Sequence, residues 1–197
     1  MRRFVVAAVI FAPVLFMLPA CSTLLGGAAS PTLQSAVTGD RMPLTLPTQV
    51  FAQDKAGIAD IYLTDLPVAD LASKDLSQLS GTIIHMHVFT IPSAGDTPIA
   101  TTATTSTARV VILANGQAGV YAGGGFFAAS DDDASGKTFA GSLRQATLYL
   151  RHATAGFDDR LGPSELSLRT SARRDEQAAA TLAAAIDAVV NAAQIVE

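Results

Sequence analysis

Asn115-Gly116 lies between two apolar runs, and this dipeptide constrains the fold more than any other feature of the sequence. The flanking residues 109–114 and 117–121 are rich in Val, Ile, Leu and Tyr. Asn and Gly both tolerate the positive φ angles of the two-residue turn that joins antiparallel strands. The segment therefore predicts a β-hairpin and, with it, an antiparallel sheet.

Four other segments have the patterns of strands. Residues 59–64 alternate apolar and polar side chains, as a half-buried strand does. Residues 82–91 form a β-branched and aromatic run that predicts a central strand, and residues 138–151 and 165–172 predict two more. The triple glycine 123–125 predicts a bulge or a tight bend in the same sheet.

The C-terminal segment has the pattern of a helix. Asp175 can cap it, and Glu176 in its first turn suits the positive end of the helix dipole. Apolar side chains then recur at helical spacing on one face, at Leu182, Ala185, Ile186, Val189 and Ala193. We predict an α+β fold for a single domain at 53–197, an antiparallel, meander-like sheet of five to six strands with this helix packed on one face. A small barrel or sandwich with a terminal helix is the alternative.

The N-terminal segment has the parts of a secretory signal. Arg2 and Arg3 precede an apolar run over 4–18, which would extend roughly 22 Å as a helix and is short of the ~30 Å hydrocarbon layer. The sequence Leu18-Pro19-Ala20-Cys21 resembles the lipobox of bacterial lipoproteins. That resemblance implies that residues 1–20 are a signal peptide and that Cys21 is acylated and becomes the N-terminus. It also implies anchoring at the periplasmic face of the outer membrane of a Gram-negative bacterium.

The segment that follows the cysteine is rich in small and turn residues. This composition predicts a flexible tether over 21–52 between the lipid and the folded domain. The whole chain has 13 bases and 17 acids, so loss of Arg2 and Arg3 leaves 11 bases against 17 acids, a net charge of −6. This acidic balance argues against nucleic acid as a partner, and a lone cysteine excludes a disulfide framework.

Two ligand-loop patterns overlap near residue 135, and both are incomplete. Residues 135–138 read Ser-Gly-Lys-Thr, but a phosphate-binding loop needs glycine where Asp131 stands, so we expect no nucleotide. Asp131, Asp133 and residues 135–136 match the start of a calcium loop, whose twelfth position is Ser142 instead of Glu. A solvated acidic turn between two strands is the preferred interpretation.

His85-Met86-His87 is the pattern closest to an organised site. Residues i and i+2 of a strand point to one face, so both imidazoles could bind one zinc or copper ion. His152, Asp158 or Asp159 would supply the third ligand. The preferred interpretation is structural: the two histidines lie on the wetter face while Ile84, Met86 and Val88 lie in the core.

These observations leave two functions open. The first is a non-catalytic, membrane-tethered envelope module that binds a protein or another envelope component through loops or a sheet edge. The second is a periplasmic metal-dependent enzyme built on His85 and His87. We prefer the first, because no Gly-x-Ser-x-Gly or Ser-x-x-Lys motif of nucleophilic catalysis occurs in the sequence.

Overall fold

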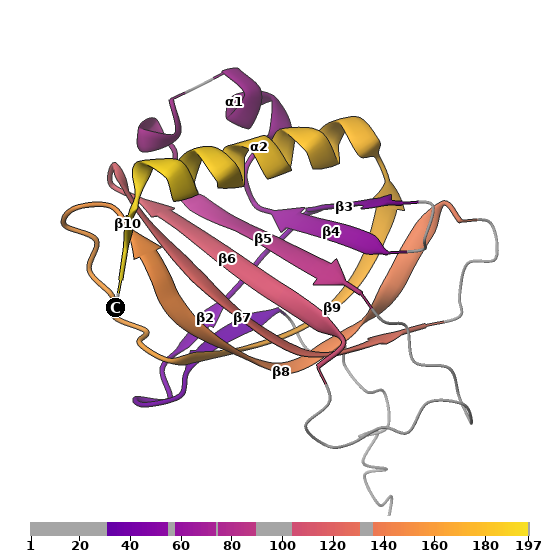
Figure 1. Ribbon diagram of the computed structural model, residues 1–197, viewed down its shortest axis with the longest axis horizontal. Coiled ribbons are helices and arrows are strands. Elements are labelled where there is room, and N and C mark those ends of the chain that lie inside the picture. Colours follow the sequence, from indigo (N-terminus) through magenta and orange to yellow (C-terminus); the bar gives the residue numbers. More distant parts are fainter. Residues whose placement is uncertain (1–30, 55–57, 74, 90–103, 131–135, 197) are drawn as a thin grey trace, which may run out of the picture.

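A computed structural model of the chain describes residues 31–54, 58–73, 75–89, 104–130 and 136–196 (Figure 1). Its centre is one mixed sheet of ten strands in the order β10-β8-β7-β6-β5-β4-β3-β9-β1-β2. The strands are β1 (Thr32–Ser35), β2 (Arg41–Pro43), β3 (Thr48–Gln53), β4 (Ala59–Thr64), β5 (Gly81–Val88), β6 (Ser106–Ala114), β7 (Gln117–Ala129), β8 (Thr138–Ala153), β9 (Ser164–Arg174) and β10 (Gln194–Ile195). The helical elements are α1 (Val68–Ser73), the 3₁₀ helix η1 (Leu76–Gln78) and α2 (Glu176–Ala192).

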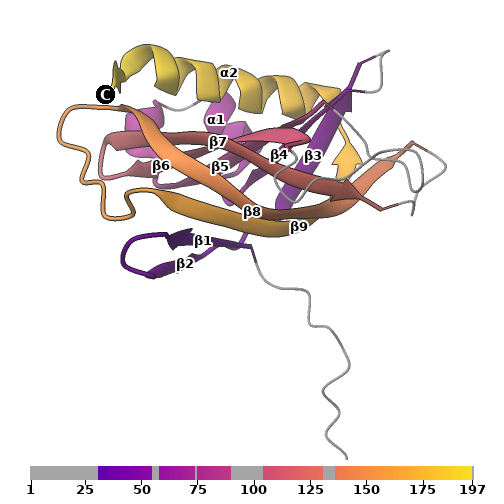
Figure 2. The same cartoon turned by 60° about the horizontal axis from the view of Figure 1, so that its bottom comes forward.

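The sheet closes on itself. Strands β3 to β9 pair in chain order, each antiparallel to the next, and β9 then pairs in parallel with β3. The parallel contact is short, joining Val50 to Arg173 and Phe51 to Arg174. The first half of β9 pairs instead with β1, so the β1–β2 hairpin lies on the side of the sheet opposite α2 (Figure 2).

The closed sheet surrounds the larger of two apolar cores. Alternate residues of each strand point inward, which is why Ile84, Met86 and Val88 are buried together while their neighbours on β5 point outward. Phe51, Tyr121 and other inward side chains of the surrounding strands complete this core.

The second core lies between the outer face of the sheet and the helices. Asp175 caps α2, since its side chain accepts a hydrogen bond from the backbone nitrogen of Ala178 at 3.0 Å. Leu182 and Ile186 of α2 pack in one core with sheet residues that include Tyr62 and Val111. Within the part of the chain that the structure describes, no helix is long and apolar enough to cross a membrane.

Glycine positions shape the longest pair of strands, β7 and β8. A Cβ on Gly123 would lie 1.8 Å from the carbonyl oxygen of Thr147, so only glycine allows this approach. The pairing shifts register between Gly124 and Phe126, which confirms the bulge predicted from the triple glycine. The turn prediction is confirmed as well, because Asn115 and Gly116 have φ angles of 53° and 78° between β6 and β7.

The predicted sheet is wrong in strand number and in pairing. Five to six antiparallel strands were expected, and the structure has ten strands with a parallel closure. The expectation missed β2 and β10, which have three and two residues and are too short to show a period of two, and also β1 and β3. The predicted C-terminal helix is confirmed, with Leu182, Ala185, Ile186 and Val189 buried.

The N-terminal predictions have different outcomes. Of the stretch expected to be a flexible tether, 21–52, the structure describes residues 31–52. These contain β1, β2 and most of β3, so residues 31–52 belong to the folded domain. Leu33, Leu44 and Leu46 are buried in the inner core, and this burial holds the segment in place. The predicted signal peptide and Cys21 lie outside the described residues, as do residues 131–135 of the incomplete ligand loops.

Candidate functional site

The pairing of β4 with β5 builds the candidate site. In this register Asp60 lies opposite His87 and Tyr62 lies opposite His85. All four side chains belong to the outer face, because the residues that alternate with them, such as Ile61 and Met86, fill the inner core. The outer face is the one that α2 partly covers (Figure 1).

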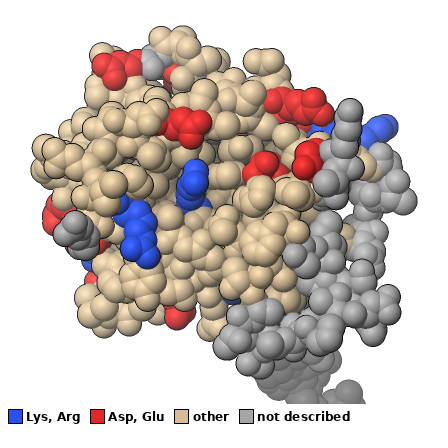
Figure 3. Space-filling view, viewed as in Figure 1, with Lys and Arg blue, Asp and Glu red and all other residues tan. Residues whose placement is uncertain are grey.

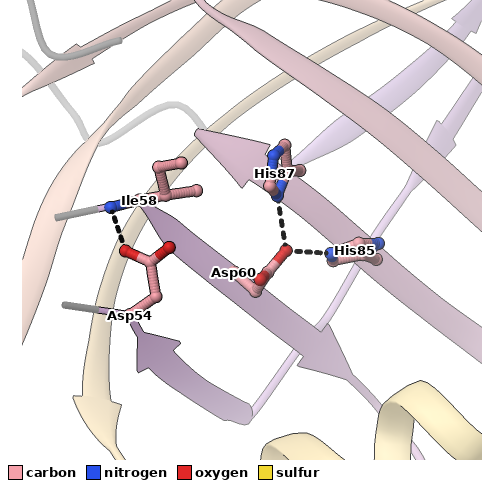
Figure 4. Close-up of polar contacts among 5 residues, drawn as sticks. All are labelled: Asp54, Ile58, Asp60, His85 and His87. Atoms are coloured by element: carbon pink, nitrogen blue, oxygen red, sulfur yellow. Dashed lines mark hydrogen bonds and ion pairs between the residues drawn. The ribbon is translucent and has the colours of Figure 1, made fainter. Parts of the chain in front are cut away.

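Asp60 lies between the two histidines and binds both through one oxygen (Figure 4). Its Oδ1 is 2.8 Å from Nε2 of His85 and 2.8 Å from Nδ1 of His87. The three side chains differ in exposure: 15% for His85, 39% for His87 and 37% for Asp60. The cluster is therefore more open to solvent on the side of His87 than on the side of His85.

Burial and hydrogen bonding set the protonation of the cluster. Burial raises the pKa of Asp60, but the hydrogen bonds and charges of His85 and His87 outweigh it and lower that pKa below its ordinary value. Burial lowers the pKa of His85, although its hydrogen bond to Asp60 opposes the shift. At neutral pH the site thus holds an ionised carboxylate next to a neutral His85.

Aromatic rings flank both histidines. The ring of Tyr62 stacks on His85 with 4.6 Å between centroids and 7° between planes. Phe89, which follows β5 and is 42% exposed, has its ring 6.4 Å from that of His87. Burial, with Asp60 and Asp187 nearby, raises the pKa of the Tyr62 phenol to about 12, so this group stays protonated.

Charged groups are sparse on this face of the molecule, where Figure 3 shows isolated acidic and basic side chains on a mostly uncharged surface. Arg109 of β6 lies opposite His85 in register, and it forms no ion pair with any acid of the described residues. Asp54 lies at the end of β3 beside the cluster, where its Oδ1 accepts a hydrogen bond from the backbone nitrogen of Ile58 at 2.9 Å (Figure 4).

The predicted histidine pair is present in the structure, but the side chain that joins its two members is Asp60 and not His152, Asp158 or Asp159. His85 and His87 share one face, and Ile84, Met86 and Val88 are buried as the structural interpretation expected. His152, proposed as a third ligand, lies on β8 opposite Val120, so β6 and β7 separate it from the pair. That separation is three strand spacings of about 4.8 Å each.

The other proposed third ligands serve a different purpose. Asp159 accepts a hydrogen bond from the Tyr121 hydroxyl at 2.5 Å and two more from the backbone nitrogens of Leu161 and Gly162. Asp158 pairs with Arg160 at 2.8 Å on the surface. Both aspartates therefore organise the loop between β8 and β9.

Asp60 is the residue that sequence reasoning missed. It is part of the alternating pattern of residues 59–64, in which a polar residue on the wetter face needs no further explanation. Only the register between β4 and β5 places it beside the histidines. The sequence carries no signal for that register, because a period of two fits several alignments of the two strands.

The geometry of the cluster is that of a hydrogen-bonded triad. The nitrogens that face Asp60 point at its Oδ1 at hydrogen-bond distance, whereas metal ligands converge on a common point about 2.0–2.2 Å away. Among the described residues, no group of three or more His, Cys, Asp or Glu side chains could hold a metal ion.

Two apolar hollows lie away from this cluster. One, of about 310 Å³, lies between η1, the β6–β7 turn and the last turns of α2, where Leu76, Leu113 and Val189 line it. The other, of about 390 Å³, lies where the β8–β9 loop covers one end of the closed sheet, beside Tyr121 and Phe157. Neither hollow is lined by a histidine.

In comparisons with known protein families, with curated proteins and with solved structures, the chain matches none of them.

Proposed function

We propose that this chain is a lipid-anchored module of a bacterial cell envelope that binds a protein partner through the Asp60–His85–His87 cluster. The lipobox-like sequence ending at Cys21 supports the anchor and an address at the periplasmic face of the outer membrane. A lipid-held domain stays at the membrane surface, where a partner of the same compartment meets it.

The proposed binding role rests on the solvent exposure of the cluster. α2 buries Tyr62 on the outer face but leaves Asp60 and His87 more than a third exposed. Phe89 adds an exposed aromatic ring next to them. A partly desolvated polar cluster beside an exposed aromatic side chain is typical of recognition surfaces.

A metal-dependent enzyme, the alternative drawn from the sequence, has less support. It requires the histidine pair and a third side chain to direct their donor atoms at one ion. Here the nitrogens next to Asp60 are engaged by its Oδ1, and His152 lies beyond two intervening strands.

In-cell photocrosslinking tests the binding role. The full chain is produced with p-benzoylphenylalanine at position 89, and the matched control has it at position 37, since Val37 is 74% exposed on the β1–β2 turn opposite α2. We expect a discrete adduct with one envelope protein from position 89 only. We also expect the Asp60→Asn substitution to reduce the yield of the adduct from position 89. Equal adducts from both positions, or none from position 89, would contradict the proposal.

The anchor is tested by comparing the wild-type chain with Cys21→Ser. Cells are labelled with an alkyne fatty acid and membranes are separated from soluble protein. We expect the label on the wild type only, and accumulation of an unprocessed Cys21→Ser precursor. An unlabelled wild-type chain, or a fully processed and membrane-bound variant, would exclude a lipoprotein.

A further inference from the structure

We propose that the Asp60–His85–His87 cluster binds a cationic hydrogen-bond donor, the ammonium or guanidinium group of a basic side chain on the partner, and that acidification releases it. The inference rests on the proposed function, because it names the chemistry by which that site recognises a protein. It follows from the hydrogen bonds, the local charges and the neighbouring ring.

The shared carboxylate determines which nitrogens carry protons. An ionised aspartate only accepts hydrogen bonds, so both imidazoles must donate to Oδ1 of Asp60, His85 from Nε2 and His87 from Nδ1. In a neutral imidazole the other nitrogen is then an acceptor. Nε2 of His87 and Oδ2 of Asp60 thus present lone pairs, and no described residue donates a hydrogen bond to either atom. A ligand that satisfies them must be a donor.

The charges around the cluster favour a cation. Asp60 contributes negative charge from β4, and Asp187 contributes it from α2. Arg109 of β6 is the opposing charge, and it lies next to His85, on the less exposed side. At the start of α2, Arg173 pairs with Asp175 at 3.1 Å and Arg174 with Glu176 at 3.3 Å, so those charges balance.

Phe89 completes the site on the exposed side. An aromatic face within about 6 Å attracts an ammonium or guanidinium group, with Arg the more frequent partner. The ring lies next to His87, whose Nε2 is the proposed acceptor. A basic side chain can therefore place its charged group between Asp60 and the ring of Phe89.

A proton competes with such a ligand. Protonation of His87 turns Nε2 from an acceptor into a donor and adds a positive charge next to Asp60. Both changes oppose a bound cation. Burial lowers the pKa of His85, whose side chain is 15% exposed, whereas the side chain of His87 is 39% exposed and lies where solvent and a bound cation meet the cluster.

Titration of the full chain in uncharged detergent micelles tests the inference. The probes are Nα-acetyl-lysine amide and Nα-acetyl-arginine amide, with Nα-acetyl-norleucine amide as the neutral ligand of similar shape. Histidine side-chain NMR shifts are followed at about pH 7.5 and about pH 5.0, on either side of the usual histidine titration. We expect both cationic probes, but not norleucine amide, to move the His87 signals at the higher pH only.

Variants separate this result from nonspecific attraction to an acidic protein. Asp60→Asn keeps an acceptor for the histidines and should weaken both cationic probes about tenfold, the effect of losing one charge-assisted hydrogen bond. The matched control Asp158→Asn also removes one exposed carboxylate, from the ion pair with Arg160, and should leave binding unchanged. Phe89→Leu should weaken the arginine probe more than the lysine probe.

Four outcomes would overturn the inference: no binding, equal binding of norleucine amide, equal weakening by Asp158→Asn, or tighter binding at the lower pH. The proposed binding of a partner and the proposed ligand class can be contradicted independently of each other. A crosslink from position 89 without cation selectivity contradicts only the ligand class. Selective binding of the cationic probes without any crosslink contradicts the role in partner binding.

Discussion

The ring of Tyr62 stacks on the imidazole of His85, with 4.6 Å between the ring centroids and 7° between the ring planes. Tyr62 is buried in the core beneath α2, whereas His85 belongs to the polar cluster with Asp60. This contact joins the helix-covered part of the outer face to its open part. The packing of Tyr62 therefore helps to determine how far His85 is removed from water.

The first prediction follows from this stack. Tyr62→Leu should expose His85 and move its pKa up toward the ordinary value of 6.5, because burial is the main cause of the lowered pKa. Tyr62→Phe retains a stacking ring and should leave the His85 titration unchanged. NMR titration of the two variants measures this. A shift of similar size in both would show that the hydroxyl, and not the ring, controls His85.

The second prediction concerns stability and pH. The pKa of His85 is lower in the folded chain than the 6.5 of the unfolded chain, so the unfolded chain binds more protons as pH falls below 6.5. The free energy of unfolding should decrease as pH falls through this window. A second decrease should follow near and below 3.8, as Asp60, whose folded pKa is lowered, is protonated.

Urea denaturation of wild type and His85→Gln across this range checks the second prediction. Glutamine cannot take up the proton, so the variant should lose the decrease below pH 6.5 and keep the one at lower pH. A wild-type stability that rises on mild acidification would contradict the assignment of a neutral His85.

The third prediction tests the packing of α2. Leu182 is fully buried between the helix and the sheet, so Leu182→Ala should cost about 2–5 kcal/mol of unfolding free energy. Exposed Asn191→Ala near the end of the same helix should change it by less than about 0.5 kcal/mol. Chemical denaturation measures both values. Equal, negligible losses would mean that α2 contributes nothing to the folded core.

The fourth prediction tests the close approach of β7 and β8. Gly123→Ala places a methyl group against the carbonyl oxygen of Thr147 and should cost on the order of 3 kcal/mol, because the obstructing atom is backbone. In Gly39→Ala the added Cβ meets no atom within 4 Å. Only the φ angle of 78° is unfavourable for a side chain there, so this variant should lose about 1–2 kcal/mol of unfolding free energy. Thermal denaturation of both variants should rank them in this order.

The fifth prediction distinguishes the hydrogen-bonded triad from a metal centre. The full chain, purified without chelator, should carry only trace zinc and copper. His85→Ala and His87→Ala should leave these amounts unchanged, because Asp60 already occupies the nitrogens that face it. Stoichiometric metal in the wild type that both variants lose, measured by mass spectrometry, would restore the enzyme alternative.

Local chemistry in the sequence was sufficient for the elements with strong signals. Asn115-Gly116 predicts its turn because few residue pairs accept two positive φ angles. The apolar spacing of Leu182, Ile186 and Val189, with the cap at Asp175, predicts α2 because a helix face and its first turn are properties of one segment. The alternation around His85 and His87 likewise predicts that both lie outside the core.

Only the tertiary structure decided how these elements meet. The parallel contact of Val50 with Arg173 closes the sheet, and it joins residues too far apart in the chain for any local pattern to reveal. The pairing of Asp60 with His87 depends in the same way on the register of β4 against β5, and one step of slippage would turn Asp60 into the core. Residue spacing determines which face a side chain occupies, whereas its neighbours on that face depend on packing across the whole sheet.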